Sequence, residues 1–113
     1  GAKLNATLNN GTLSTIDALF QNKNLQFLNL FPNPTEGIVH LEYYLPKQMD
    51  GATAKVYDMV GRLVWVQSIE RSEGIQQANL NLNTLKKGNY IVIIIAGNNR
   101  GEQFVTNKIL ILK

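Results

Sequence analysis

The regular spacing of turn-forming residues constrains the fold of this chain more than any other feature. From residue 25 onward, clusters of Gly, Pro, Asn, Asp and Ser separate apolar segments that are six to eleven residues long. Several segments alternate between apolar and polar residues: in residues 38–45, Val39 and Leu41 share one side while His40 and Glu42 share the other. Alternation of this kind is typical of half-buried strands. The pattern predicts an all-β fold.

Seven strands are expected, the number found in an immunoglobulin-like β-sandwich. They are residues 25–31, 38–45, 52–57, 62–69, 75–82, 89–96 and 102–112. The chain has 113 residues, which corresponds to one domain. We therefore predict a seven-stranded antiparallel immunoglobulin-like β-sandwich with Greek-key connections over residues 25–113. Residues 1–24 are interpreted as a linker, in which Ser14 and Asp17 favour a short helical turn.

Two connections have distinctive turn chemistry. Pro32 and Pro34 fix φ and remove two backbone donors, so the segment between the first two strands is a rigid break. Residues 58–61 predict a tight hairpin, in which Asp58 caps the turn and Gly61 supplies a positive φ.

The later strands are apolar on both sides, which a plain sandwich does not require. In residues 89–96, Val92 and Ile94 fall on one side and Ile91 and Ile93 on the other. Large exposed apolar patches mark interfaces. This second face is therefore expected either to lie under a covering segment or to dock another protein, and it also allows a dimer.

Composition excludes several classes of function. Charged residues make up 17% of the chain and hydrophobic residues 44%, which argues against intrinsic disorder. The net charge is +3 with no basic run longer than Lys86–Lys87, so nucleic acid is not an expected partner. Cysteine is absent, which removes disulfides and Cys-ligated metals. The longest apolar run, Tyr90–Ala96, is far shorter than the roughly 20 residues of a membrane span.

The catalytic inventory is thin. His40 is the one histidine, and none of the three serines lies in a Gly-x-Ser-x-Gly motif. His40 shares a strand face with Glu42, but the sequence indicates no further metal ligands. We interpret His40 as a solvated strand-face residue and expect no catalytic residue, cofactor or metal.

Four separated motifs make the chain resemble a known family, the type A C-terminal sorting domain of the type IX (Por) secretion system of Bacteroidetes. They are Leu30–Gly37, Val56–Val64, Leu85–Val92 and Lys108–Lys113. In order, they match the family's Pro-Asn-Pro-x-x-Gly element, Tyr-Asp-x-x-Gly-Arg-x-Val hairpin, Leu-x-x-Gly-x-Tyr-x-Val element and closing Lys-plus-aliphatic strand. A rival resemblance, to the flagellar hook-capping repeat, lacks support because residues 79–83 contain no Trp-Asp-Gly.

The resemblance implies a non-catalytic address at the C-terminus of an exported cargo protein. The cargo reaches the periplasm by a separate N-terminal signal, and the outer-membrane translocon recognises the folded domain. In many members a surface sortase then cuts in the upstream linker and attaches the cargo to an anionic lipopolysaccharide, while others are released. The expected location is therefore the cell surface or the medium, without membrane insertion.

Two sets of residues follow, the first from the matched motifs and the second from the two-faced apolar pattern of the last strand. The structural motif residues are Pro32, Asn33, Pro34, Gly37, Tyr57, Asp58, Gly61, Arg62, Gly88 and Tyr90. The expected translocon-recognition residues are Lys108, Ile109, Leu110, Ile111, Leu112 and Lys113. If this last strand lies at a sheet edge, its free backbone groups can accept a strand from a partner.

Two other functions stay open at this point. An appended cell-surface or carbohydrate-binding β-sandwich would need exposed aromatic side chains to stack on sugar rings. The candidates are Tyr43, Tyr44, Tyr57, Trp65 and Phe104. The other alternative is a structural spacer domain.

Overall fold

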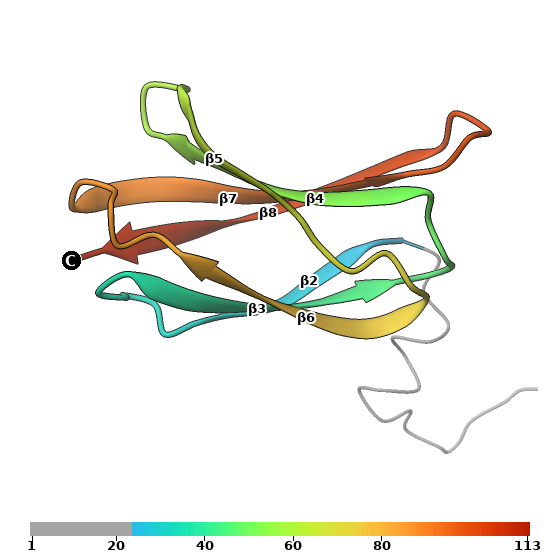
Figure 1. Cartoon of the computed structure of the whole chain (residues 1–113), viewed down its shortest axis with the longest axis horizontal. Helices are drawn as coiled ribbons and strands as arrows, with labels where there is room; N and C mark the ends of the chain where they lie inside the picture. The colour runs from blue at the N-terminus through green and yellow to red at the C-terminus, as the bar shows by residue number, and fades with distance from the viewer. Residues whose placement is uncertain (1–23) are drawn as a thin grey trace, which may run out of the picture.

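Two antiparallel sheets pack face to face in this computed structural model, which describes residues 24–113 (Figure 1). The strands are β2 (Gln26–Phe31), β3 (Ile38–Leu45), β4 (Gly51–Asp58), β5 (Leu63–Ser68), β6 (Gly74–Asn81), β7 (Gly88–Gly97) and β8 (Gln103–Leu112). One sheet has the order β2-β3-β6 and the other the order β5-β4-β7-β8. The predicted all-β sandwich of seven antiparallel strands is confirmed. The Greek-key and immunoglobulin-like assignment stays a prediction, and the helical turn proposed at Ser14 lies outside the described residues.

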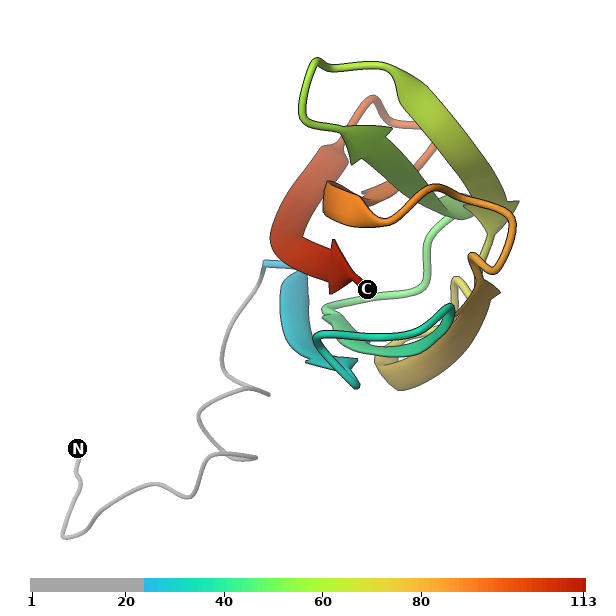
Figure 2. The same ribbon diagram turned by 90° about the vertical axis from the view of Figure 1, so that its left-hand side faces the viewer.

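The core lies between the two layers, as the view along the strands shows (Figure 2). Alternation along the strands decides which side chains enter it: in β3, Val39, Leu41 and Tyr43 point inward and have no exposed surface. β4 and β7 alternate in the same way, and Val56 and Ile94 meet the β3 side chains from the opposite sheet. Burying one such side chain contributes about 1.5–3 kcal/mol, so the inward positions supply most of the driving force for folding.

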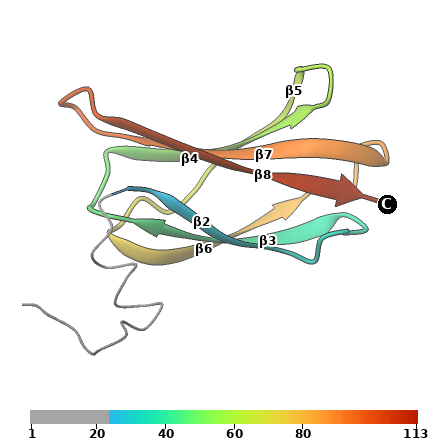
Figure 3. The ribbon, with the colours of Figure 1, turned by 180° about the vertical axis from the view of Figure 1, so that it is seen from behind.

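The chain crosses between the sheets after β3, β5 and β6, while β4–β5 and β7–β8 are hairpins within the four-stranded sheet (Figure 3). The two crossings at one end are tied together. The Met49 N–H donates to the Arg71 carbonyl at 2.9 Å, and Arg71 Nη1 donates to the Met49 carbonyl at 3.1 Å. The Tyr43 hydroxyl donates to the Glu70 carbonyl at 2.7 Å. Burial, with a smaller contribution from the Glu70 charge, raises the pKa of Tyr43 to about 12.

Strand β5 departs from simple alternation. The β4–β5 register shifts between Val56 and Tyr57, so that Val64 and Trp65, although neighbours in sequence, both pack against the core. Strict alternation would place these two neighbouring side chains on opposite faces of the sheet. A bulge adds one residue to one strand and reorients the side chains around it, which explains the difference.

Leu41 provides a direct test of this core. Leu41→Ala removes a fully buried side chain from the middle of β3, and we expect the free energy of unfolding to fall by about 2–5 kcal/mol. Ile38→Ala, on the same strand but 50% exposed, is the matched control and should change it by less than about 0.5 kcal/mol. Urea unfolding of the full chain measures both, and equal losses would contradict the inward placement of Leu41.

Candidate recognition surface

The loop between β2 and β3 closes one edge of the sandwich by binding the end of β8. Asn33 Nδ2 donates to the Ile109 carbonyl at 2.8 Å, and the Ile111 N–H donates to Asn33 Oδ1 at 3.0 Å. The Thr35 N–H donates to the Ile111 carbonyl, and the Lys113 N–H donates to the Thr35 carbonyl, both at 2.9 Å. The Pro32–Thr35 segment therefore acts as a clamp on the last five residues of the chain.

Gly37 is needed at the end of this loop because another chain segment passes close by. A Cβ at this position would lie 1.7 Å from Asn83 Oδ1 and 3.3 Å from the Asn83 Cα. The Gly37 carbonyl also accepts a hydrogen bond from the Leu82 N–H at 2.9 Å. The glycine of the first motif thus allows the loop to pack against the connection that follows β6.

The two sides of β8 divide the expected recognition residues. Leu110 and Leu112 point into the core, with 0% and 3% exposure, so their role in the folded domain is packing. Ile109 and Ile111 point outward and are 50% and 42% exposed. Lys108 is on the inward-facing side, where its ammonium lies 5.8 Å from the centre of the Phe27 ring. Such a contact covers the gap between β8 and β2 with a cation on an aromatic face.

Strand β8 lies at the edge of its sheet, as the strand-addition hypothesis requires. The outward backbone groups near its end are nevertheless occupied by the clamp, at Ile109, Ile111 and Lys113. A partner strand could pair there only after displacing Asn33 and Thr35. The side chains of Ile109 and Ile111, rather than the backbone, are what this part of β8 presents to a partner.

The Asp58 turn joins β4 and β5 through side-chain and backbone hydrogen bonds. Asp58 Oδ1 accepts from the Val60 and Arg62 N–H groups at 3.1 and 2.9 Å, and Arg62 Nε donates to Asp58 Oδ2 at 2.7 Å. These hydrogen bonds, that of the Arg62 N–H above all, hold the pKa of Asp58 below its usual range. Gly61 has φ +90°, which confirms the positive φ predicted for this turn.

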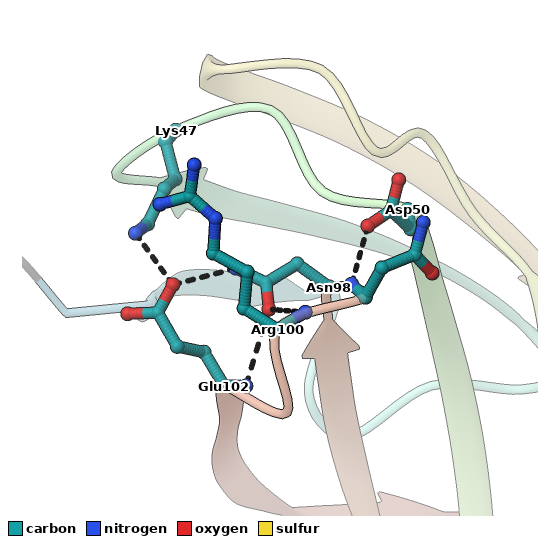
Figure 4. Close-up of polar contacts among 6 residues, drawn as sticks. Lys47, Asp50, Asn98, Arg100 and Glu102 are labelled. Carbon is teal, nitrogen blue, oxygen red and sulfur yellow. Dashed lines mark hydrogen bonds and ion pairs between the residues drawn. The ribbon is translucent and has the colours of Figure 1, made fainter.

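The β7–β8 hairpin repeats this arrangement (Figure 4). Asn98 Oδ1 accepts from the Arg100 and Glu102 N–H groups at 2.9 and 3.1 Å, and Asn98 Nδ2 donates to Glu102 Oε1 at 2.6 Å. Glu102 also forms an ion pair with Lys47 at 2.7 Å. The hydrogen bond from Lys47, and after it the one from Asn98, lowers the pKa of Glu102. Asp50 Oδ2 accepts from the backbone N–H of Asn99 at 2.6 Å. The expected strands 89–96 and 102–112 imply a hairpin here, but its likeness to the Asp58 turn was not predicted, although the shared Asx-x-x-Gly spacing could have revealed it.

The remaining motif residues have packing roles. Tyr90 is buried, and its hydroxyl donates to the Lys86 carbonyl in the turn before β7. Gly88 begins β7 with φ +152°. Tyr57 ends the outward side of β4, opposite Leu63 on one neighbour and Ile91 on the other.

His40 and Glu42 each have a partner on the outward side of the three-stranded sheet. His40 Nδ1 pairs with Asn79 Oδ1, and its ring lies 5.4 Å from that of Phe31. Glu42 Oε1 accepts from Asn29 Nδ2 at 2.7 Å. Within residues 24–113, no three His, Cys, Asp or Glu side chains are grouped as a metal site would need.

The aromatic residues considered for sugar binding do not form a platform. Tyr43 and Tyr44 are buried, while Trp65 and Phe104 pack against the core. Tyr44 and Tyr57 occupy outward strand positions, but they lie on different sheets and Tyr44 is 4% exposed, so the two rings do not form a row of stacking surfaces.

Together the fold and this edge define a small β-sandwich whose accessible features are a clamped final strand and an apolar sheet face. Residues 29–112 match the secretion system C-terminal sorting domain family, and the chain therefore belongs to that family. No curated protein matches the chain. Membership makes this domain a type IX sorting signal of the kind found in Bacteroidetes, directing export to the cell surface or the medium. Domains of this family are generally non-catalytic.

The clamp gives the first prediction for this edge. Asn33→Ala removes two hydrogen bonds, each contributing about 0.5–1.5 kcal/mol, and should speed the exchange of the Ile111 amide hydrogen in NMR measurements. Asn99→Ala is the control, because no hydrogen bond of the Asn99 side chain occurs within the described residues. Unchanged Ile111 exchange in a folded Asn33→Ala variant would contradict the clamp.

The Asp58 turn gives a pH prediction. Because the folded-state pKa of Asp58 is lowered, its carboxylate stabilises the fold above the unfolded value of about 3.9, and this contribution is lost as the pH falls through the folded value. Asp58→Asn should therefore be less stable than the parent at neutral pH, and the difference should shrink toward pH 2. Unfolding curves from pH 2 to 7 measure this. Met59→Gln, 58% exposed in the same turn, should keep the parent's profile.

Proposed function

We propose that the outer-membrane translocon recognises residues 25–113 as a folded unit through the outward side of β8, and that a surface sortase then cuts the chain within residues 1–24. Recognition through β8 is supported by the way its side chains alternate between the core and the outward side. Ile109 and Ile111 are apolar, half exposed and held in place by the clamp, while Leu110 and Leu112 anchor the same strand in the core. Lys113 follows the strand as an exposed cation.

The clamp supports recognition of the folded state. The end of β8 is held in this arrangement by the Pro32–Thr35 segment, 76 residues or more away in sequence, in addition to its pairing with β7. A translocon that reads Ile109 and Ile111 in this arrangement accepts the domain only after the sandwich has closed. The position of residues 1–24 supports the proposed cut site, because a cut there separates the cargo from β2, the first strand of the domain.

The same outward side would be buried in a dimer of this chain. Sedimentation of the purified chain separates the two cases, because a surface occupied by a second copy is not free for the translocon. The carbohydrate-binding alternative has no supporting feature among the described residues, since their aromatic side chains do not line up on one face.

An export assay tests the proposal. The 113-residue chain is fused behind a fluorescent protein with a periplasmic signal, in a Bacteroidetes host with and without its type IX translocon. We expect translocon-dependent fluorescence on the surface or in the medium, lost when residues 104–113 are deleted. The double variant Ile109→Asn, Ile111→Asn should lose most export, because two polar groups would be desolvated at the contact.

Ile38→Asn is the matched control, being a 50% exposed isoleucine on the other sheet. It should be exported like the parent. If the double variant folds, as thermal unfolding reports, and is still exported fully, recognition through β8 is wrong. Retention of a folded parent fusion in the periplasm would instead indicate an appended binding or spacer domain.

A further inference from the structure

The outward side of the four-stranded sheet, called here the outer face, is apolar across all four strands. Its apolar members are Tyr57, Leu63, Val66, Ile91, Ile93, Ile95, Val105, Ile109 and Ile111. Val66 and Val105 are 54% and 59% exposed. Among residues 24–113, no element packs over this side of the sheet (Figures 1 and 3). The outer face therefore continues the surface of Ile109 and Ile111 over β7, β4 and β5.

One charged side chain lies near the centre of this face. Lys55 is opposite Val66 on β5 and opposite Ile93 on β7. The rows on either side contain Ile91 and Ile95, so most of the side chains around the Lys55 stem are apolar, and the polar neighbours, Thr53 and Ser68, are uncharged. The other outward strand positions are apolar or uncharged polar residues, and Lys113 follows at the rim, beyond the end of β8.

Lys55 has no carboxylate partner within the described part of the chain. The two ion pairs found there are Lys47–Glu102 and Arg62–Asp58, both at hairpin ends. A cation kept at the centre of an apolar surface costs solvation energy when that surface is covered, unless the covering surface supplies an anion. The charge of Lys55 therefore specifies what can cover the outer face.

A second copy of the chain fits this face poorly. Two outer faces packed about a two-fold axis would bring two Lys55 ammonium groups together with no acid on either side. The patch is also small, since its four strands span about 14 Å and the four rows that contain its apolar side chains about 20 Å. That is well below the roughly 800 Å² per partner of a stable interface, and suits a transient partner.

We propose that the outer face docks an apolar surface of the export machinery that carries one carboxylate opposite Lys55. The apolar residues supply the buried area, and the Lys55–carboxylate pair fixes the orientation and rejects apolar surfaces that lack an acid. This inference rests on the proposed function, because it describes the surface of the export machinery that would bind the outward side of β8.

Lys55→Met separates this proposal from simple apolar docking. Methionine keeps an unbranched stem but removes the charge, so a purely apolar partner would bind it at least as well as the parent. A partner with a carboxylate would be left with an unpaired buried charge. In the export assay above, we expect Lys55→Met to reduce export at least about tenfold and Lys55→Arg to remain within about twofold of the parent.

Lys87→Met is the matched control, an exposed lysine in the turn before β7, and should be exported like the parent. Thermal unfolding of the purified chains verifies that every variant is folded. If Lys55→Met is folded and exported as well as the parent, the carboxylate proposal is overturned while the proposed function stands. If the parent itself is exported equally without the translocon, the proposed function fails first.

Two further measurements identify other occupants. Residues 1–23 contain one acid, Asp17, so an equal loss of export with Asp17→Asn would assign the carboxylate to the chain itself and overturn the proposal. Sedimentation of parent and Lys55→Met tests the second copy. A parent that is monomeric at assay concentrations supports the proposal, and a dimer that Lys55→Met tightens would overturn it.

Discussion

The hydrogen bonds between Asn33 and the end of β8 are the constraint on which the rest of the sandwich edge depends. One side-chain amide uses its donor and its acceptor on Ile109 and Ile111, and Thr35 adds two backbone bonds that reach Lys113. These contacts join the first connection of the domain to its last residue. An exposed strand edge is a hazard for aggregation, and proteins protect it by covering the backbone groups. The clamp provides that cover while the side chains of β8 stay accessible.

Local and long-range interactions divide the work in this fold. The Asp58 and Asn98 turns use the same chemistry, an Asx side chain that accepts two backbone N–H groups and pairs with the residue four positions later. These hydrogen bonds join residues close in sequence, and the Asn98 turn is tied in addition to Lys47 and Asp50. The sandwich, by contrast, closes through Asn33 and Gly37, whose partners lie 45 to 78 residues further along the chain. Contacts of such separation slow folding, because loop closure comes before the contact that rewards it.

The same division explains what could be predicted from the sequence. Alternation and turn chemistry predicted β3 with its observed bounds and the positive φ of Gly61, because both depend on residues close in sequence. The inward position of Lys108 over Phe27 was not predicted, since it depends on how far β8 lies from β2. The core contacts of Val64 were also missed, because a bulge shifts the register without leaving a signal in the pattern. The apolar outer face was predicted, but the central position of Lys55 needed the register of three strands.

An export signal has to satisfy two opposed requirements. It must present enough apolar surface to be bound briefly by a partner, and yet it must not associate with other copies or with unrelated apolar surfaces. The clamp meets part of this requirement by closing the backbone edge of β8. Lys55 meets another part, because a cation in the middle of an apolar sheet face penalises any covering surface that lacks an acid. The edge of β8 is thus protected by hydrogen bonds and the outer face by the charge of Lys55. The side chains of β8 remain exposed, but covering them is favourable only for a surface that supplies an acid.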